Sequence, residues 1–369
     1  MGDATPEEDL PPYLTRVVAT RGSQYFTVPG SLCGVIHDGS REIARNRLLS
    51  SETLNQMRLR SPGAQLRWLL RQRQPGGRSL VIPGCFDGLV ARMCARQGFD
   101  ALYLSGGGVS ALSGVPDVGI KSEKDFTEKI RALTDSSGLP VISDADTGFA
   151  DPAHTVRAFV GAGAAGLHIE DQVFPKRCGH LLGKQIVPPE EFESTIRRCV
   201  KARKSSADAD FIICARSDAR GVAGGSVEKT VARLQRYADA GADMLFPEGM
   251  RSADEFVQVA EALHASHGNS HSGGPFMLCN MTEFGQTPHI TASELGEMGY
   301  DLTIFPLGLF RLAMRAVESG IAELKQEGSL ANKEEEMLTR NELYHLLKYD
   351  PSAEEPWAYP SPERSEERD

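Results

Sequence analysis

From residue 79 onward, short apolar runs alternate with longer amphipathic runs along the chain. The short runs are typical of strands, because they are continuously apolar and are bounded by Gly, Pro or Asp. The predicted strands are SLVIPG, ALYLSG, PVISDAD, AGLHIED, FIICARSD, DMLFPEG, PFMLCNM and DLTIFPL.

The longer runs repeat apolar residues at helical spacing, and several start after Ser, Thr or Asp and stop at Gly. The predicted helices are DGLVARMCARQG, EKDFTEKIRALTDSSG, DPAHTVRAFVGAG, PEEFESTIRRCVKAR, SVEKTVARLQRYADAG, SADEFVQVAEALHA and TASELGEMG. This rhythm over about 250 residues predicts an α/β fold, the (β/α)8 TIM-type barrel. The alternative is a doubly wound open sheet, but the PGCFDG that follows the first strand is not its phosphate-binding turn.

Three regions are expected. Residues 1–74 form a partly disordered extension, with a helix over SPGAQLRWLLRQRQ that packs on the body or on a neighbouring subunit. Residues 75–325 form the catalytic barrel. Residues 326–369 hold a helical stretch, NKEEEMLTRNELYHLLKYD, and a disordered tail rich in Pro, Glu and Ser.

Polar side chains recur where the predicted strands end. In a (β/α)8 barrel, function gathers at the carboxyl ends of the strands, so this recurrence predicts a concave polar pocket. The residues are Ser105, Asp144, Asp146, His168, Glu170, Asp171, Arg216, Asp218, Glu248, Asn280, Thr282 and Glu283.

Asp144 and Asp146 give the sharpest local signal, the triplet DAD. Residues two apart in an extended segment point the same way, so both carboxylates are expected to face one site. Mg²⁺, or Mn²⁺ in its place, prefers carboxylate oxygens and keeps several waters, which Glu170 and Glu248 would help to hold. The alternative is that Asp146 caps a turn before Gly148.

Three further strand-end features each have two interpretations. Arg216 is expected to clamp a carboxylate or phosphate of the substrate, and its alternative is a structural ion pair with Asp144 or Glu248. The glycines of SGGGVSALSG either let backbone N–H groups approach an anion or form a flexible turn. His168 is interpreted as a core residue with its polar atoms satisfied rather than as a ligand.

The segment FPKRCGHLLGK follows the fourth predicted strand and carries Cys178. It belongs to a long connection of the kind that forms lids on barrels. Lys176 and Arg177 are expected to lower the pKa of the Cys178 thiol and so suit it to proton transfer near neutral pH. One Cys and one His are too few for a zinc site, and a free surface thiol is the alternative.

Composition narrows the partners and the compartment. The chain has 369 residues and a net charge of -10, which disfavours nucleic acid as a partner but permits a small anionic substrate. No apolar run long enough to span a membrane occurs. The seven scattered cysteines lack any CxxC and indicate a reducing compartment. The acidic start and the Arg-rich residues 11–78 leave the cytoplasm and the mitochondrial matrix both open.

Several motifs together resemble one family. YLSGGGVSAL, GVPDVGI, DADTGF, GAAGLHIEDQ, PKRCGH, ARSDA, GADMLFPEG, NMTEFGQTP and TRNELY are similar to those of the isocitrate lyase/phosphoenolpyruvate mutase superfamily. Within it they look most like the 2-methylisocitrate lyases. The resemblance covers roughly residues 75–350.

This resemblance implies a Mg²⁺-dependent barrel whose last helix is exchanged between subunits, in a homotetramer built as a dimer of helix-swapped dimers. It implies retro-aldol cleavage of 2-methylisocitrate, a tricarboxylate, to pyruvate and succinate, a step of propionate catabolism in the methylcitrate cycle. It implies that Asp144 and Asp146 bind the metal. Cys178 protonates the carbanion of the departing succinate when the lid closes.

The remaining residues are assigned by the same motifs. The catalytic residues besides Cys178 are Arg216, Glu170 and Asp117, of which Arg216 contacts substrate oxygens and Asp117 orients the site. The substrate-binding residues at the pyruvate-forming end are Ser105, Gly106 and Gly107. Those at the other product's carboxylates are Gly179, His180, Asn280 and Thr282, and Glu248 assists at the metal.

Other members of the superfamily are the alternatives. Dimethylmalate lyase and oxaloacetate hydrolase keep a similar KRCGH loop, isocitrate lyase usually has a longer chain, and the phosphonopyruvate-type mutases lack the CGH lid. A non-enzymatic carboxylate-binding barrel would require a broken site, whereas every expected polar group is present in the sequence.

Overall fold

The computed structural model describes residues 15–18, 24–27, 60–177 and 183–352. Near the N-terminus, strands β1 (Thr15–Val18) and β2 (Gln24–Thr27) pair antiparallel. They are separate from the main sheet. Cys178, Gly179 and His180 lie outside the described residues, so their predicted roles remain predictions.

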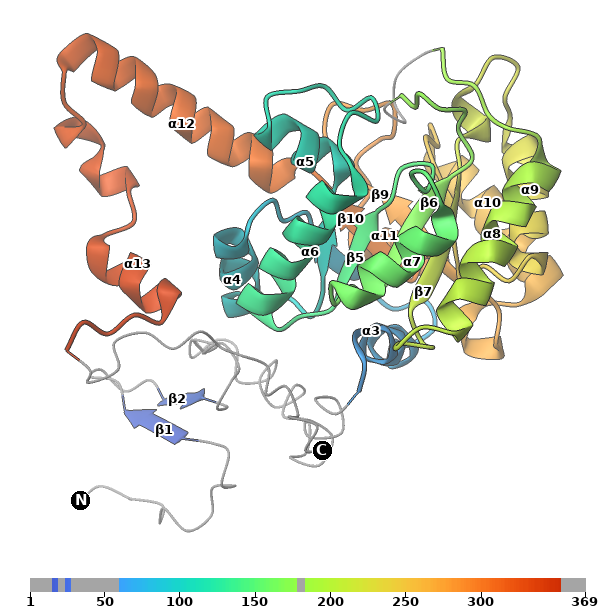
Figure 1. The fold of residues 1–369 in the computed structure, drawn as a ribbon, viewed down its shortest axis with the longest axis horizontal. Coiled ribbons are helices and arrows are strands. Elements are labelled where there is room, and N and C mark those ends of the chain that lie inside the picture. The colour runs from blue at the N-terminus through green and yellow to red at the C-terminus, as the bar shows by residue number, and fades with distance from the viewer. Residues whose placement is uncertain (1–14, 19–23, 28–59, 178–182, 353–369) are drawn as a thin grey trace.

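Eight parallel strands form a barrel, as the alternation of runs predicts (Figure 1). Their order around the sheet is β3-β10-β9-β8-β7-β6-β5-β4. A parallel bridge between Gly84 and Tyr103 joins the two ends of this order, which excludes the open doubly wound sheet. The strands are β3 (Leu80–Pro83), β4 (Leu102–Leu104), β5 (Val141–Asp144), β6 (Gly166–Glu170), β7 (Ile212–Ser217), β8 (Met244–Pro247), β9 (Phe276–Asn280) and β10 (Leu302–Phe305).

Helices between the strands surround the barrel, and all seven predicted ones are present. They are α4 (Gly88–Arg96), α6 (Glu123–Ser137), α7 (Pro152–Gly161), α8 (Pro189–Lys204), α9 (Val227–Asp239), α10 (Ala253–His267) and α11 (Ala292–Glu297). The Ser, Thr and Asp residues predicted to start several of these helices act as their N-caps. The side chain of Ser122, for example, accepts from Asp125 N, while Asp125 accepts from Ser122 N in return. Short 3-10 turns are η3 (Ala219–Gly221), η4 (Ser270–Ser272) and η5 (Ala331–Glu336).

Helix α3 (Pro62–Arg71) is the helix expected in SPGAQLRWLLRQRQ, and it packs on the body of the barrel. Its Leu66 and Leu70 are fully buried in one cluster with apolar side chains of the strands. The Arg67 guanidinium reaches Asp243, the residue just before β8, at 2.6 Å. The helix therefore covers the end of the barrel at which the strands begin (Figure 1).

Two C-terminal helices, α12 (Gly308–Glu327) and α13 (Arg340–Leu347), complete the described chain. Helix α12 leaves the barrel as a long arm and has no buried residue (Figure 1). Its Leu312 and Ile321 are 70% and 64% exposed. The boundary expected at residue 325 falls within its last turn. Helix α13 has one buried residue, Leu346, and packs on α4. Across all the described residues, no helix is long and apolar enough to cross a membrane.

Candidate active site

Strand register brings the predicted polar residues to one end of the barrel. Asp144 of β5 lies level with His168 of β6, and Glu170 lies level with Arg216 of β7. Because the strands are parallel, these side chains lie at a single rim. Of the predicted site residues that the structure describes, the buried polar ones at this rim are Ser105, Asp144, Asp146, Glu170, Arg216, Glu248 and Thr282.

Asp144 and Asp146 lie together, but the backbone that joins them differs from the extended segment expected. Strand β5 ends at Asp144, and Asp146 has a φ of 47°, in the left-handed region. Asp144 Oδ1 accepts from Asp146 N at 2.9 Å. Gly148 N donates to Ala145 O, so the turn before Gly148 is real. A tight turn therefore places the two carboxylates side by side, and the turn and the metal interpretations are compatible.

The two carboxylates have pKa values shifted in opposite directions. Burial and the charge of Asp144 raise the pKa of Asp146 to about 7. Burial also acts to raise the pKa of Asp144, but His168, Lys176 and Arg216 outweigh it and lower that pKa. Two buried carboxylates of this kind repel each other unless a cation lies between or beside them. The pair is thus a place where positive charge is stabilised.

Lys176 supplies one such charge, and this role was not predicted. Its side chain is only 3% exposed, and its Nζ lies 2.7 Å from Asp146 Oδ1 and 2.6 Å from Asp117 Oδ1. Burial alone would lower the pKa of Lys176, but Asp144, Glu170 and Asp146 raise it well above its usual value. Lys176 thus joins Asp117 to Asp146, and the predicted role of Asp117 in orienting the site stays a prediction. The expected effect of Lys176 on the pKa of Cys178 stays a prediction, because Cys178 lies outside the described residues.

Arg216 is held by three carboxylates and an aromatic ring. Its Nε and Nη2 donate to the two oxygens of Asp218 at 2.9 and 3.2 Å. Its Nη1 lies 3.3 Å from Glu170 Oε2 and 3.6 Å from Glu248 Oε2. The guanidinium also stacks over Phe246, with Cζ 5.2 Å from the ring centroid. The alternative of an ion pair with Glu248 is confirmed, whereas the principal partner, Asp218, was not predicted.

The glycine-rich stretch after β4 forms a helix rather than a flexible turn. Helix α5 (Gly106–Leu112) starts directly after Ser105. Gly106 N donates to Asp144 Oδ2 at 3.1 Å. A Cβ at Gly106 would lie 2.7 Å from that oxygen, so a larger residue would displace the carboxylate. One backbone N–H expected to bind an anion therefore binds a carboxylate of the protein itself.

Asn280 is the last residue of β9, and Thr282 follows it on the same rim. The Asn280 amide donates to Glu248 Oε2 at 3.3 Å. Within the described part of the chain, Asn280 Oδ1 and Glu170 Oε1 are buried and have no hydrogen-bond partner. Burial raises the pKa of Glu170 well above its usual value, although Arg216 and Lys176 act in the other direction. Unpaired buried oxygens of this kind need a donor or a cation to compensate their lost hydration.

The buried carboxylate oxygens at this rim fit a divalent metal ion. Among the described residues, no three His, Cys, Asp or Glu side chains form a ready-made ligand set. Asp144 and Asp146 offer two carboxylates, and Glu170 offers a third buried oxygen nearby. A hard cation that takes few protein ligands and keeps its waters suits this set better than zinc does.

His168 is a core residue, as expected, but its Nδ1 is buried without a hydrogen-bond partner among the described residues, so its polar atoms are not all satisfied. Its Nε2 shares a 2.8 Å hydrogen bond with the Tyr103 hydroxyl, and its ring lies against Phe246. Its Nδ1 is 3.7 Å from Asp144 Oδ1. Burial lowers the pKa of His168 to about 4, so the imidazole is neutral at neutral pH.

Acid should therefore destabilise the fold through His168. The unfolded imidazole takes up a proton near pH 6.5, whereas the folded one resists until about pH 4. The free energy of unfolding should fall by about 2 kcal/mol between pH 7 and pH 5 on account of this residue alone. Urea unfolding at both pH values would measure this, and His168→Gln should lose that part of the dependence. The exposed His154→Gln is the matched control, and an unchanged dependence in His168→Gln would contradict the prediction.

The segment that carries Cys178 is fixed at both ends. Gln172 pairs with Ile186, and Val173 N donates to Gln185 O at 2.9 Å. The Gln172 amide also donates to Arg177 O and accepts from Arg177 N. The described residues on either side of 178–182 are therefore held by backbone and side-chain hydrogen bonds.

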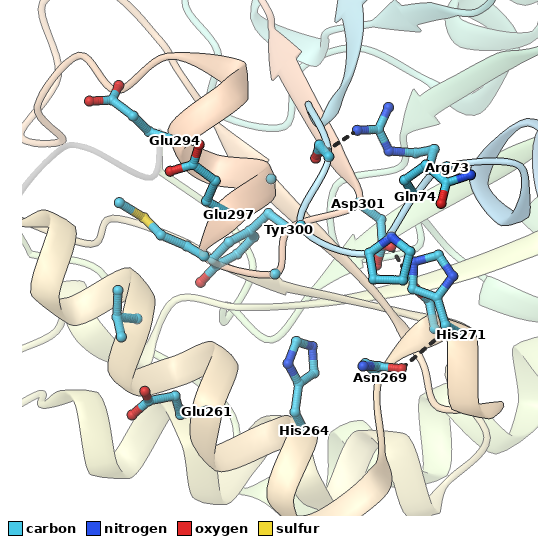
Figure 2. Close-up of a pocket in the computed structure, with 18 residues that line it drawn as sticks. Arg73, Gln74, Glu261, His264, Asn269, His271, Glu294, Glu297, Tyr300 and Asp301 are labelled. Carbon is cyan, nitrogen blue, oxygen red and sulfur yellow. Dashed lines mark hydrogen bonds between the residues drawn. The ribbon is translucent and has the colours of Figure 1, made fainter.

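A separate cavity of about 490 Å³ lies at the opposite end of the barrel (Figure 2). Asp301, the residue before β10, lines it together with Arg73, His264 and Tyr300. Asp301 is already bound, since it accepts from Ser270 Oγ and from Met277 N. Residues at this end of a (β/α)8 barrel serve stability, so we place the chemistry at the rim of Asp144 and Arg216.

Comparison with known proteins agrees with that placement. A family model described as phosphoenolpyruvate phosphomutase matches residues 70–325. The chain is 42% identical to 2-methylisocitrate lyase of Escherichia coli K12 over 298 residues, which are 79% of this chain and 94% of that protein. The structure resembles 2,3-dimethylmalate lyase, with a TM-score of 0.69, 36% identity and coverage of 78% and 91% of the two chains. It also resembles phosphonopyruvate hydrolase in complex with oxalate and Mg²⁺, with a TM-score of 0.66, 26% identity and coverage of 78% and 94%.

Proposed function

Since this chain belongs to the phosphoenolpyruvate mutase/isocitrate lyase superfamily, we propose that it is a Mg²⁺-dependent lyase that cleaves 2-methylisocitrate to pyruvate and succinate. The observation that carries the proposal is the rim itself. The carboxylate pair of Asp144 and Asp146 and the buried guanidinium of Arg216 lie in one ring of side chains. A metal site beside a fixed cation suits an anionic, oxygen-rich substrate.

In this proposal Asp144 and Asp146 hold the metal, directly or through water, and Glu170 Oε1 adds a buried acceptor for its waters. Mg²⁺, when bound, would stabilise the negative charge that develops on the substrate's hydroxyl oxygen. The Mg²⁺ and oxalate in the related hydrolase support this choice of ion. Mn²⁺ has the same ligand preferences and would substitute.

The chain's own side chains orient the substrate and move the protons. Arg216 binds oxygens of the substrate, while Ser105 and the start of α5 bind its pyruvate-forming end. A base takes the hydroxyl proton, and the oxygen forms the carbonyl of pyruvate as the carbon–carbon bond breaks. The electron pair of that bond passes to the succinate carbon. Cys178 then gives its thiol proton to that carbon, which completes succinate.

The apolar arm of α12 supports the proposed homotetramer. A helix of this length with no buried residue exposes more apolar surface than a monomer normally tolerates. We propose that a second copy of the chain covers it, as exchange of the last barrel helix would do. The side chains that would be covered are Leu309, Leu312, Met314, Val317, Ile321 and Leu324.

Pyruvate release from four acids would test the function. We expect the highest kcat/KM with 2-methylisocitrate, lower values with isocitrate, 2,3-dimethylmalate and oxaloacetate, and loss of activity with a chelator. A preference for dimethylmalate or oxaloacetate would move the assignment to those members of the superfamily. No turnover of any of the four acids would overturn the enzymatic proposal.

A further inference from the structure

We infer that Lys184 is a positioning residue of this site, because it holds the Asp218 carboxylate that orients the substrate-binding guanidinium of Arg216. The inference rests on the proposed function in one respect, that Arg216 binds an anionic substrate. It concerns a residue with no local signal in the sequence, since Lys184 stands in a connection and not at a strand end.

The contact is direct and completely buried. Lys184 Nζ lies 2.6 Å from Asp218 Oδ1, and neither side chain is exposed to solvent. The same Oδ1 accepts from Arg216 Nη2 at 3.2 Å, while Oδ2 accepts from Arg216 Nε at 2.9 Å. One carboxylate is thus shared between two cations, and each of its oxygens has a fixed donor.

The backbone of Asp218 is fixed as well. Its N–H donates to Asp171 Oδ1 at 2.9 Å, and Asp171 in turn accepts from Ser217 Oγ and the Tyr237 hydroxyl. The Asp218 carboxylate can therefore rotate only about its own side-chain bonds. Lys184 removes that remaining freedom and so sets the plane in which Arg216 lies against Phe246.

Charge gives Lys184 a second effect. Arg216 lies near three carboxylates, Asp218, Glu170 and Glu248, in a place shielded from water. Asp218, with the two glutamates beside it, would offset the charge of the guanidinium and leave little net attraction for an anionic substrate. By neutralising Asp218 from the other side, Lys184 leaves the charge of Arg216 available to the site.

Lys184→Met removes the charge and keeps an unbranched side chain of similar length. Of the described cations paired with the Asp218 carboxylate, Arg216 then remains, and the guanidinium is drawn toward Asp218 and away from substrate. We expect the Kd of oxalate, measured by calorimetry in the presence of Mg²⁺, to rise about 10- to 100-fold. The KM for the substrate should rise with it. The Kd of Mg²⁺ alone should stay within about twofold, because Lys184 acts on Asp218, which follows β7, and not on the carboxylate pair of the metal site.

The double variant Lys184→Met/Asp218→Asn separates positioning from a loss of folding. If Lys184 acts through Asp218, it should have little effect once that carboxylate is neutral, so the double variant should bind oxalate within about threefold of Asp218→Asn. This comparison decides the question even if Lys184→Met alone does not fold. The exposed Lys124→Met is the matched control and should leave oxalate binding unchanged.

Two results would overturn the inference. One is an oxalate Kd in folded Lys184→Met equal to that of the unaltered protein. The other is a further tenfold loss from Lys184→Met in the Asp218→Asn background. A protein that binds oxalate in this Lys184-dependent way but cleaves none of the four acids would instead refute the proposed function and leave the inference intact.

Discussion

Asp146→Asn is expected to lower kcat/KM by about 10³-fold or more, because it removes one of the two carboxylates of the proposed metal site. The Asn side chain has nearly the same shape and leaves the backbone turn at φ 47° tolerable, since Asn adopts the left-handed region readily. The loss should therefore come from charge and not from folding. Calorimetry should show Mg²⁺ binding weakened about 100-fold or more.

Asp146 is a better choice for this test than Asp144. Asp144 accepts hydrogen bonds from the backbone of Gly106 and Asp146, and an amide there would place its N–H₂ against one of these donors. Within the described residues, the Asp146 carboxylate forms its ion pair with the Lys176 ammonium, and Lys176 keeps Asp117 as a second partner. Asp239→Asn on the surface is the matched control. Unchanged Mg²⁺ affinity in Asp146→Asn would refute the assignment of the metal to this pair.

The strands and the polar rim could be predicted because one physical cause produces both signals. A parallel strand buried on both faces is a continuous apolar run, and the first polar residue after it lies at the carboxyl end. Asp144, Glu170 and Arg216 were found in this way. The same reasoning predicts that these residues lie at one rim, although it predicts no distance between them. The observed strand register brings them to one level.

Features that depend on long-range contacts could not be predicted. Lys176 and Lys184 are buried against carboxylates that lie on other elements of the barrel, and a lysine in a connection normally faces water. Three consecutive glycines disfavour a helix by propensity, yet α5 forms there, packed beside Asp144 and α6. The left-handed turn at Asp146 likewise replaced the extended geometry expected of DAD.

Cys178→Ala is expected to lower kcat by about 10²- to 10⁴-fold with little change in KM, because a proton donor acts in the transition state and not in substrate binding. Three of the described thiols, those of Cys199, Cys214 and Cys279, do not offer a substitute. Burial raises the pKa of Cys199 and of Cys279 to about 12, and it raises that of Cys214 well above its usual value. None of these three is poised to exchange a proton near pH 7.

Hydrogen exchange at the succinate carbon gives a readout specific to the proton donor. In D₂O with pyruvate and Mg²⁺, the unaltered enzyme should exchange a C2 hydrogen of succinate, as seen by NMR, and Cys178→Ala should not. Cys178→Ser should fall between the two in kcat, since a hydroxyl is a far weaker acid than a thiol. Cys199→Ala, in α8 on the outside of the barrel, is the matched control and should keep both activities. A proton donor is needed both for cleavage and for exchange, so its loss should lower both. Full lyase activity or full exchange in Cys178→Ala would therefore assign the proton to another group at the rim.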